Sequence, residues 1–258
     1  MPFFLILFFL CVSSLVFSQG NFPHPNAHAH NDYEHVQPLW NALAAGFISV
    51  EADVHLVEGK LLTSHGKPQP GAPSLQQLYL APLDSLLSLH GDKIYPGYAG
   101  TFYLMIDCKT EAERTYRAIQ KEVQRFKRLL CNSSRCPVMI FISGNRAIDA
   151  MMKEGYQGIA MDGRPGDLGK GIAAELMPMV SDHYANWSSW KGKMNVQPDE
   201  LAQIRELAQR VHAEGKKLRL WAIPDNELAW SALLDVGVDF INTDRLEALH
   251  DFLTSRGQ

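Results

Sequence analysis

The sequence alternates short apolar segments with amphipathic segments, and this alternation restricts the possible folds more than any other feature. The apolar segments are short and nearly continuous, which is typical of strands buried on both faces of a sheet. Strands that alternate with helices form parallel sheets, because each helix returns the chain to the start of the next strand. The predicted strands are residues 26–30, 48–54, 101–109, 138–143, 158–162, 177–182, 217–223 and 239–244.

Helical patterns follow each of these strands. The clearest covers residues 111–130, with apolar residues on one face and charged residues on the other. The other predicted helices are residues 38–46, 75–91, 145–155, 168–176, 199–215, 226–237 and 245–253. Eight strand–helix units predict a (β/α)₈ TIM barrel, an α/β fold, and a doubly wound open sheet is the alternative.

The N-terminal segment is apolar over residues 3–17 and becomes small and polar at residues 18–20, as in a secretory signal peptide. We expect residues 1–19 to be cleaved, residues 20–258 to form one domain, and the protein to be secreted or periplasmic. An uncleaved membrane anchor is the alternative, although the apolar run is short for a full span. The net charge of −4 and the lack of a basic patch argue against a nucleic-acid partner. We expect a monomer, with any membrane contact confined to its surface.

The cysteines support the same compartment. Cys131 and Cys136 bracket a short loop and would form a disulfide in an exported protein, the alternative being two free thiols. Cys108 lies within an apolar run and is interpreted as a buried small residue rather than a nucleophile.

Polar and ionisable residues stand at the end of nearly every predicted strand. In a TIM barrel the chemistry gathers at these ends, where the strands lead into the following loops. Such groups at a barrel mouth cost desolvation free energy unless they are paired or bind a metal, so they indicate a polar site. The residues are His28, His30, Asn31, Glu51, Asp53, Asp107, Lys109, Ser143, Asn145, Asp162, Arg164, Asp182, His183, Trp221, Thr243 and Asp244.

Three carboxylates are the candidate metal ligands. Glu51 and Asp53 lie two residues apart in one strand, so both side chains face the same side. Asp107 offers a third carboxylate from the next strand. Neighbouring carboxylates repel one another unless a cation relieves them, and oxygen ligands suit a hard ion such as Mg²⁺ or Ca²⁺. Ion pairing with Lys109 and other cations is the alternative.

Two histidines are candidates for proton transfer. His65 follows a predicted hairpin over residues 55–65 that would fold back over the barrel mouth. With His28 or His30 from the first strand it could flank a bound ligand, as general acid–base catalysis requires. Lys109 shares the face of Asp107 and would contact an anionic group such as phosphate.

The order H…ExD…H…DxK…W…TD resembles the glycerophosphodiester phosphodiesterase and phosphatidylinositol-specific phospholipase C-like superfamily of TIM barrels. The HxHNDY form is most similar to a branch of secreted and mitochondria-associated phosphodiesterase-like proteins. The matching segments are HAHNDY, GFISVEADVHL, LLTSHGK, LMIDCKT, LRLWAIPDN and GVDFINTDRLEAL.

The resemblance implies an exported, metal-dependent hydrolase of a glycerophosphodiester or phospholipid-type substrate, either small or lipid. One divalent ion would lie at the three carboxylates, and a first-strand histidine and His65 would form the acid–base pair. We favour His28 over His30, because Asn31 follows it by three residues, as in the phospholipase D-like toxins of this superfamily. Phosphate would contact Lys109, and the substrate site would include Asn31, Trp221 and Asp244.

The sequence departs from typical glycerophosphodiesterases at two places, which leaves the glycerol headgroup open. Ala29 follows His28 where those proteins have arginine, and the insertion after the second histidine is reduced to residues 66–100.

Two other functions are open. An HxH zinc site of the amidohydrolase type would need later histidines, which His183 and His212 supply poorly, and would leave the carboxylates unexplained. A non-catalytic barrel could bind phosphate or sugar through the aromatic NWSSW segment, residues 186–190.

Overall fold

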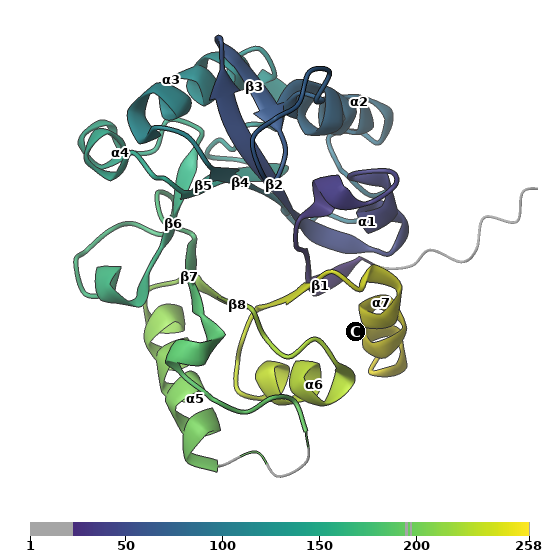
Figure 1. The fold of residues 1–258 in the computed structure, drawn as a ribbon, viewed down its shortest axis with the longest axis vertical. Coiled ribbons are helices and arrows are strands. Elements are labelled where there is room, and N and C mark those ends of the chain that lie inside the picture. Colours follow the sequence, from purple (N-terminus) through teal and green to yellow (C-terminus); the bar gives the residue numbers. More distant parts are fainter. Residues whose placement is uncertain (1–22, 194–195, 197, 258) are drawn as a thin grey trace, which may run out of the picture.

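Eight parallel strands close into a barrel in the computed structural model, which describes residues 23–193, 196 and 198–257 (Figure 1). β1 pairs with both β2 and β9, which closes the ring and excludes an open sheet. The predicted TIM barrel is thereby confirmed, whereas the predicted signal peptide lies outside the described residues. The barrel strands are β1 (His24–Ala29), β2 (Phe47–Val57), β4 (Phe102–Cys108), β5 (Val138–Gly144), β6 (Ala160–Gly163), β7 (Met179–His183), β8 (Lys217–Trp221) and β9 (Phe240–Thr243).

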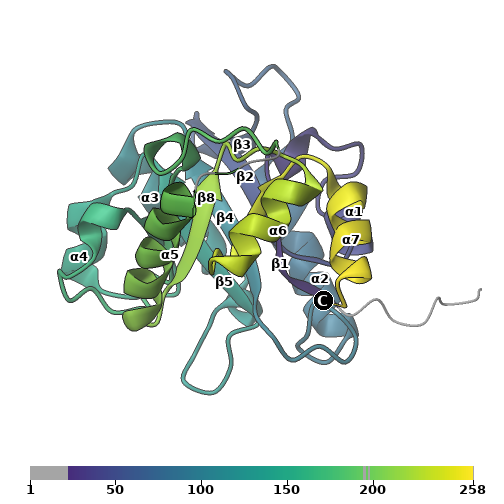
Figure 2. The ribbon, with the colours of Figure 1, turned by 90° about the horizontal axis from the view of Figure 1, so that it is seen from below.

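Helices surround the barrel and cover its outer face (Figures 1 and 2). They are α1 (Trp40–Ala44), α2 (Ala81–Leu89), α3 (Ala112–Val123), α4 (Ile148–Glu154), α5 (Pro198–Ala213), α6 (Glu227–Asp235) and α7 (Leu246–Ser255). Shorter helical turns are η1 (Asp32–Glu34), η2 (Gln76–Leu80), η3 (Lys127–Leu129), η4 (Pro165–Asp167) and η5 (Tyr184–Asn186). Within the described ranges, no helix combines the length and the apolar character needed to cross a membrane.

The predicted helix over residues 168–176 was wrong. The chain between β6 and β7 forms the 3-10 turn η4 and then further turns. Gly169 and Gly171 have φ values of +80° and +71°, in the left-handed region that breaks a right-handed helix. This connection therefore crosses the outer face without an α-helix.

The predicted hairpin after the second strand is confirmed. β3 (Lys60–Thr63) pairs antiparallel with the end of β2, and Val54 lies opposite Thr63. The Ser64 N–H then donates to the Asp53 carbonyl oxygen at 3.2 Å. This bond returns the chain to the barrel mouth, so His65 lies directly above the carboxylate strand.

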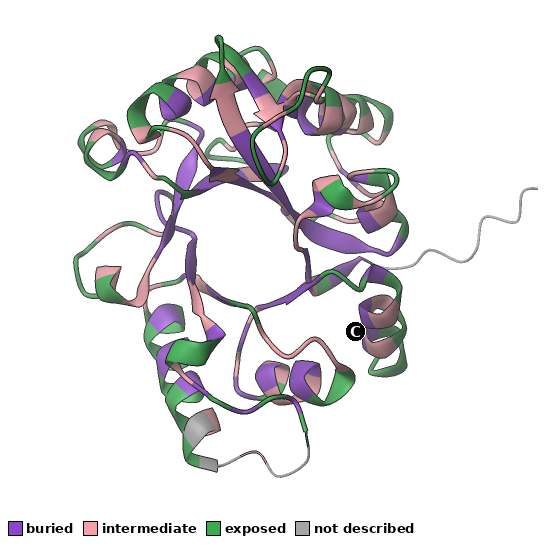
Figure 3. Ribbon diagram, viewed as in Figure 1, coloured by how far each residue is buried: buried purple, intermediate pink, exposed green. Residues whose placement is uncertain are grey.

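An apolar layer fills the barrel interior beneath a polar layer. The larger apolar cluster lies between strands and helices, and the strands themselves are buried (Figure 3). Inside the barrel, five apolar residues each precede an inward polar residue by two positions, which places the two sets at successive depths. The pairs are Met105 and Asp107, Phe141 and Ser143, Ala160 and Asp162, Met179 and Ser181, and Phe240 and Asn242. Any pocket at the strand ends is therefore closed from below.

The cysteines lie as predicted. Cys131 and Cys136 form a disulfide in the loop before β5. Cys108 is free and buried at the end of β4, and burial raises the pKa of its thiol, so it is not a reactive nucleophile.

Candidate active site

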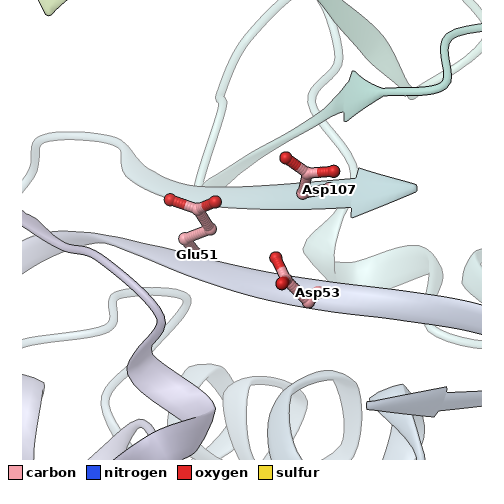
Figure 4. Close-up of side chains that lie close together, drawn as sticks. All are labelled: Glu51, Asp53 and Asp107. Atoms are coloured by element: carbon pink, nitrogen blue, oxygen red, sulfur yellow. The ribbon is translucent and has the colours of Figure 1, made fainter. Parts of the chain in front are cut away.

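The structure brings the three predicted carboxylates together at the barrel mouth (Figure 4). Glu51 and Asp53 come from β2, and Asp53 lies opposite Asp107 of β4 in the parallel pairing. One oxygen of each side chain lies within 4.8 Å of the other two. Among the described residues, no other group of three or more histidine, cysteine or acidic side chains could hold a metal.

Asp53 provides the clearest sign that a cation belongs here. Its side chain is fully buried. Tyr33, Lys109 and His65 each place a polar atom within 3.2 Å of its Oδ2 atom. Its Oδ1 atom is buried and has no hydrogen-bond partner in the described part of the chain. Leaving a buried carboxylate oxygen unpaired costs free energy, which a bound cation would recover. The donor set, three carboxylates without sulfur, fits Mg²⁺ or Ca²⁺.

Lys109 offsets part of the negative charge of the carboxylate triad, which consists of Glu51, Asp53 and Asp107. Its Nζ atom lies 3.0 Å from Asp53 Oδ2 and 3.3 Å from Asp107 Oδ1. Burial nevertheless raises the pKa of Asp107 to about 6, helped by the charges of Glu51 and Asp53 and opposed by Lys109. The protein alone thus leaves these carboxylates incompletely neutralised.

Gly144 gives Asp107 the room it needs. The residue ends β5 with φ +64°, and a Cβ atom there would lie 2.1 Å from Asp107 Oδ1. Any other residue at this position would displace the carboxylate, so this glycine belongs to the site although the sequence pattern did not single it out.

Asp53 and Tyr33 together hold the His65 side chain in place. Its Nδ1 atom lies 3.2 Å from Asp53 Oδ2 and 3.2 Å from the Tyr33 hydroxyl. Tyr33 also donates to Asp53 at 2.8 Å and lies 3.0 Å from Asn31 Oδ1. With Nδ1 occupied, Nε2 is the nitrogen of His65 that remains for proton transfer. The side chain is 68% exposed, so it is accessible from solvent.

The two first-strand histidines lie at different depths. His30 follows the end of β1, lines the pocket at the mouth, and lies 2.8 Å through Nδ1 from Asp244 Oδ1. His28 is fully buried, with Nδ1 2.7 Å from Ser49 Oγ and Nε2 3.5 Å from Glu51. Burial, with the nearby Arg219 charge, lowers the pKa of His28 to about 4. Both nitrogens of His28 are therefore engaged below the pocket, and the geometry favours His30 for proton transfer.

Arg219 is a site residue that the sequence reading missed. It lies on β8, is buried, and donates through Nη2 to Glu51 Oε2 at 3.0 Å across the barrel. Burial opposes ionisation of Glu51, but the Arg219 guanidinium together with His28 and His30 outweighs it and lowers the pKa of Glu51 to about 2. Arg219 precedes Trp221 by two residues, so the alternation that pairs Glu51 with Asp53 could have found it.

A hydrogen-bonded network continues from Arg219 around the barrel. Ser181 Oγ donates to Asp162 Oδ1 at 2.7 Å and lies 3.4 Å from Arg219 Nη1. Asp162 Oδ2 accepts from Ser143 at 2.9 Å and from Arg164 at 2.7 Å. These buried contacts fix the side chains at the ends of β5 to β8 relative to Glu51.

A pocket of about 230 Å³ lies among these groups. Trp221 forms one wall, with its ring centroid 4.2 Å from that of His183 in an edge-on contact. The pocket is lined by His30, Asn31, Glu51, His65, Asp107, Lys109, Ser143, Gly144, Arg164, Arg219 and Trp221. Asp244 lies outside this set and reaches the pocket only through His30.

The zinc and sugar-binding alternatives find little support in this geometry. His212 pairs with Asp239 at 2.7 Å and takes no part in the pocket. In the aromatic segment, Trp187 donates to Asp182 at 2.8 Å and Trp190 is buried. The two indoles stabilise their own loop instead of forming an exposed stacking surface.

Asp32 anchors the loop that carries His30. Asn31 adopts a left-handed backbone with φ 46°, which turns the chain after β1. The buried Asp32 then accepts from the Leu39 N–H at 2.6 Å and from the Tyr79 hydroxyl at 2.8 Å. The HNDY motif therefore combines a pocket histidine, a turn residue, an anchor and the tyrosine partner of His65.

Asp32→Asn is expected to change how stability depends on pH. Burial raises the pKa of Asp32 to about 6 in the folded protein, so the neutral form is favoured by folding. This contribution is complete below the unfolded pKa of about 3.9 and is lost as pH rises through 6. Between pH 3.5 and 7.5 the stability of the variant should rise relative to wild type by on the order of 3 kcal/mol. Urea denaturation across this pH range measures the difference, with the exposed Asp149→Asn as control, and parallel curves would contradict it.

The fold and the site together define a phosphodiesterase-type (β/α)₈ barrel. The chain belongs to the AIM6-like phosphodiesterase domain family, whose model matches residues 17–157, more than half of its length. This agrees with the branch that the HxHNDY form indicated.

Similar proteins agree with this placement. The Altered inheritance of mitochondria protein 6 of Kluyveromyces lactis is 27% identical over 88% of this chain and 72% of that protein. A homolog in Arthroderma benhamiae is 27% identical over 90% of this chain and 84% of that protein. The crystal structure of a glycerophosphodiester phosphodiesterase from Parabacteroides distasonis superposes with a TM-score of 0.58 and 18% identity, covering 90% of this chain and 98% of that chain. That structure has the same fold.

Proposed function

We propose that the protein hydrolyses phosphoric diesters of the glycerophosphodiester or phospholipid type, with His30 and His65 as the proton-transfer groups. The observation that carries the proposal is the pairing of two pocket histidines, each with Nδ1 beside a carboxylate, around the carboxylate triad. The family and the name of the Parabacteroides distasonis protein support the diester class. This assignment replaces His28, the histidine that the sequence favoured, because His28 lies beneath the pocket.

The two histidines divide the proton transfers. One Nε2 removes a proton from the attacking water as its oxygen bonds to phosphorus, and the other donates a proton to the leaving oxygen as the second P–O bond breaks. Asp244 holds His30, and Asp53 with Tyr33 holds His65, so both imidazoles keep Nδ1 engaged and Nε2 available. Lys109 and the walls formed by Asn31 and Trp221 would position the substrate.

A divalent ion, Mg²⁺ or Ca²⁺, would be held by Glu51, Asp53 and Asp107. When bound, such an ion polarises a phosphoryl oxygen and lowers the pKa of nearby water or hydroxyl groups. Lys109 would then be released in part from the carboxylates and face the developing negative charge.

The proposal extends to location and partners. The apolar run at residues 3–17 and the Cys131–Cys136 disulfide support export to an oxidising compartment. The partner we propose is a small or lipid diester bound by a monomeric protein, without nucleic acid.

Hydrolysis of bis(p-nitrophenyl) phosphate by the mature protein tests the proposal. We expect turnover that EDTA abolishes and Mg²⁺ or Ca²⁺ restores. His65→Ala should lower kcat by about 10²- to 10⁴-fold, because a general acid or base contributes that much. The matched control is His90→Ala, a histidine at the end of α2 remote from the pocket.

Three results of this assay would each contradict the proposed function. Turnover that survives His65→Ala would reject the two-histidine mechanism. Activity that depends on zinc would favour an HxH site. Absence of turnover with glycerophosphodiesters and phospholipids under any divalent ion would favour a binding protein.

A further inference from the structure

Arg219 does more than neutralise Glu51, and we infer that its guanidinium contacts the phosphoryl group of the substrate. The inference rests on the proposed function, because it assigns a substrate contact to the same pocket. Arg219 lines this pocket from β8, on the side away from Lys109, and its side chain is only 4% exposed. A cation in this position faces the ligand from the interior of the barrel.

The hydrogen bonds of Arg219 fix its plane and leave donors available. Nε donates to Asn242 Oδ1 at 2.9 Å, and Nη2 donates to Glu51 at 3.0 Å. Nη1 has Ser181 Oγ at 3.4 Å, a long contact. A guanidinium carries five N–H groups, so two have no partner among the residues that the structure describes. A rigid fork with unused donors beside a pocket is suited to the oxygen atoms of a phosphate.

The charges around the triad point to a monoanionic ligand. Three carboxylates face Lys109 and Arg219 in the same pocket. A divalent ion at the triad would leave one positive charge in excess, since the two cations already offset two of the carboxylates. Arg164 adds nothing to this excess, because it pairs with Asp162 at 2.7 Å. A phosphodiester carries a single negative charge and would complete the balance, whereas a phosphomonoester dianion would exceed it.

Two alternatives for Arg219 make different predictions. If Arg219 only holds Glu51 in place, its replacement should weaken binding of the divalent ion. If it contacts the phosphoryl group, its replacement should weaken anion binding and catalysis while the ion still binds. Arg219→Lys separates these effects, because lysine keeps the positive charge near Glu51 but loses the fork.

We expect Arg219→Lys to lower kcat/KM for bis(p-nitrophenyl) phosphate by about 10²-fold, as for loss of one preorganised donor. Calorimetric titration of the Mg²⁺-loaded protein, at a pH below the second pKa of phosphate so that the monoanion predominates, should show at least about tenfold weaker binding of inorganic phosphate, with Mg²⁺ affinity changed by less than about threefold. Arg205→Lys, an exposed arginine on α5, is the matched control. Asn242→Ala is the second variant, because it removes the Nε anchor without changing any charge, and it should weaken phosphate binding several-fold.

Unchanged phosphate affinity in both variants would overturn the inference, as would a loss of Mg²⁺ affinity as large as the loss of activity. Wild-type protein that binds no phosphate, with or without Mg²⁺, would overturn it as well. Wild-type protein that binds phosphate through Arg219 but hydrolyses no diester would support the contact and reject the proposed function.

Discussion

His30→Ala is expected to lower kcat for a diester substrate by about 10²- to 10⁴-fold while leaving the protein folded. The imidazole of His30 lines the pocket and is partly exposed, with Asp244 as its partner. Its removal therefore deletes a proton-transfer group without creating a cavity in the core. Steady-state kinetics with a thermal melt of the same sample measures both effects.

His28→Ala should behave in the opposite way. His28 is fully buried between Ser49 and Glu51, so truncation leaves a cavity and removes a partner of a buried carboxylate. Such changes in a core cost about 2–5 kcal/mol, which corresponds to a fall in Tm of roughly 4–20 °C in a domain of this size.

Chemical rescue gives an independent comparison. Free imidazole should restore part of the activity of His30→Ala, because the vacated position opens to the pocket, and should leave the activity of His28→Ala unchanged. The assignment is rejected if His28→Ala loses activity at unchanged Tm while His30→Ala remains active.

Asp53→Asn is expected to abolish tight binding of the divalent ion and to lower activity by about three orders of magnitude. The unpaired Oδ1 atom would no longer carry charge, and the anchor of Tyr33, Lys109 and His65 would weaken. An ion acting as a Lewis acid supplies several kcal/mol, and each 1.36 kcal/mol changes the rate tenfold. Calorimetric titration with Mg²⁺ or Mn²⁺, alongside the hydrolysis assay, measures the two losses.

An exposed aspartate provides the matched control for Asp53→Asn. Asp251→Asn removes an exposed carboxylate on α7 and should bind the ion as wild type does. If Asp53→Asn also binds the ion with wild-type affinity, the triad is not the metal centre. The fold should tolerate the substitution, because it relieves repulsion between neighbouring carboxylates.

The fold could be predicted because each strand is recognisable from a short stretch of neighbouring residues. Each barrel strand is a short apolar run, and all eight appear within three residues of the predicted ends. The carboxylate triad could also be predicted, since alternation along one strand places Glu51 and Asp53 on the same face. The false helix at residues 168–176 had a warning in Gly169 and Gly171, whose backbones are left-handed.

The remaining features of the site depend on depth and on distant partners. His28 and His30 are two residues apart, so alternation gives them the same face, and which of them reaches the pocket depends on where the strand ends, which is at Ala29 in the structure. Arg219 pairs with Glu51 across 168 residues of sequence, a contact that only closure of the barrel creates. The role of Tyr33 depends on the left-handed turn at Asn31, which no periodicity reveals.

The residues of the pocket come from two parts of the chain. The triad, both pocket histidines and Lys109 lie within residues 17–157, whereas Arg164, Arg219 and Trp221 lie beyond them. The earlier strands therefore carry the residues proposed for proton and metal chemistry, and the later strands contribute the opposite wall. Changes at Arg164 or Trp221 could alter which substrate fits, provided that Arg219 keeps its hydrogen bond to Glu51. Selectivity can evolve in this way without altering the reactive centre.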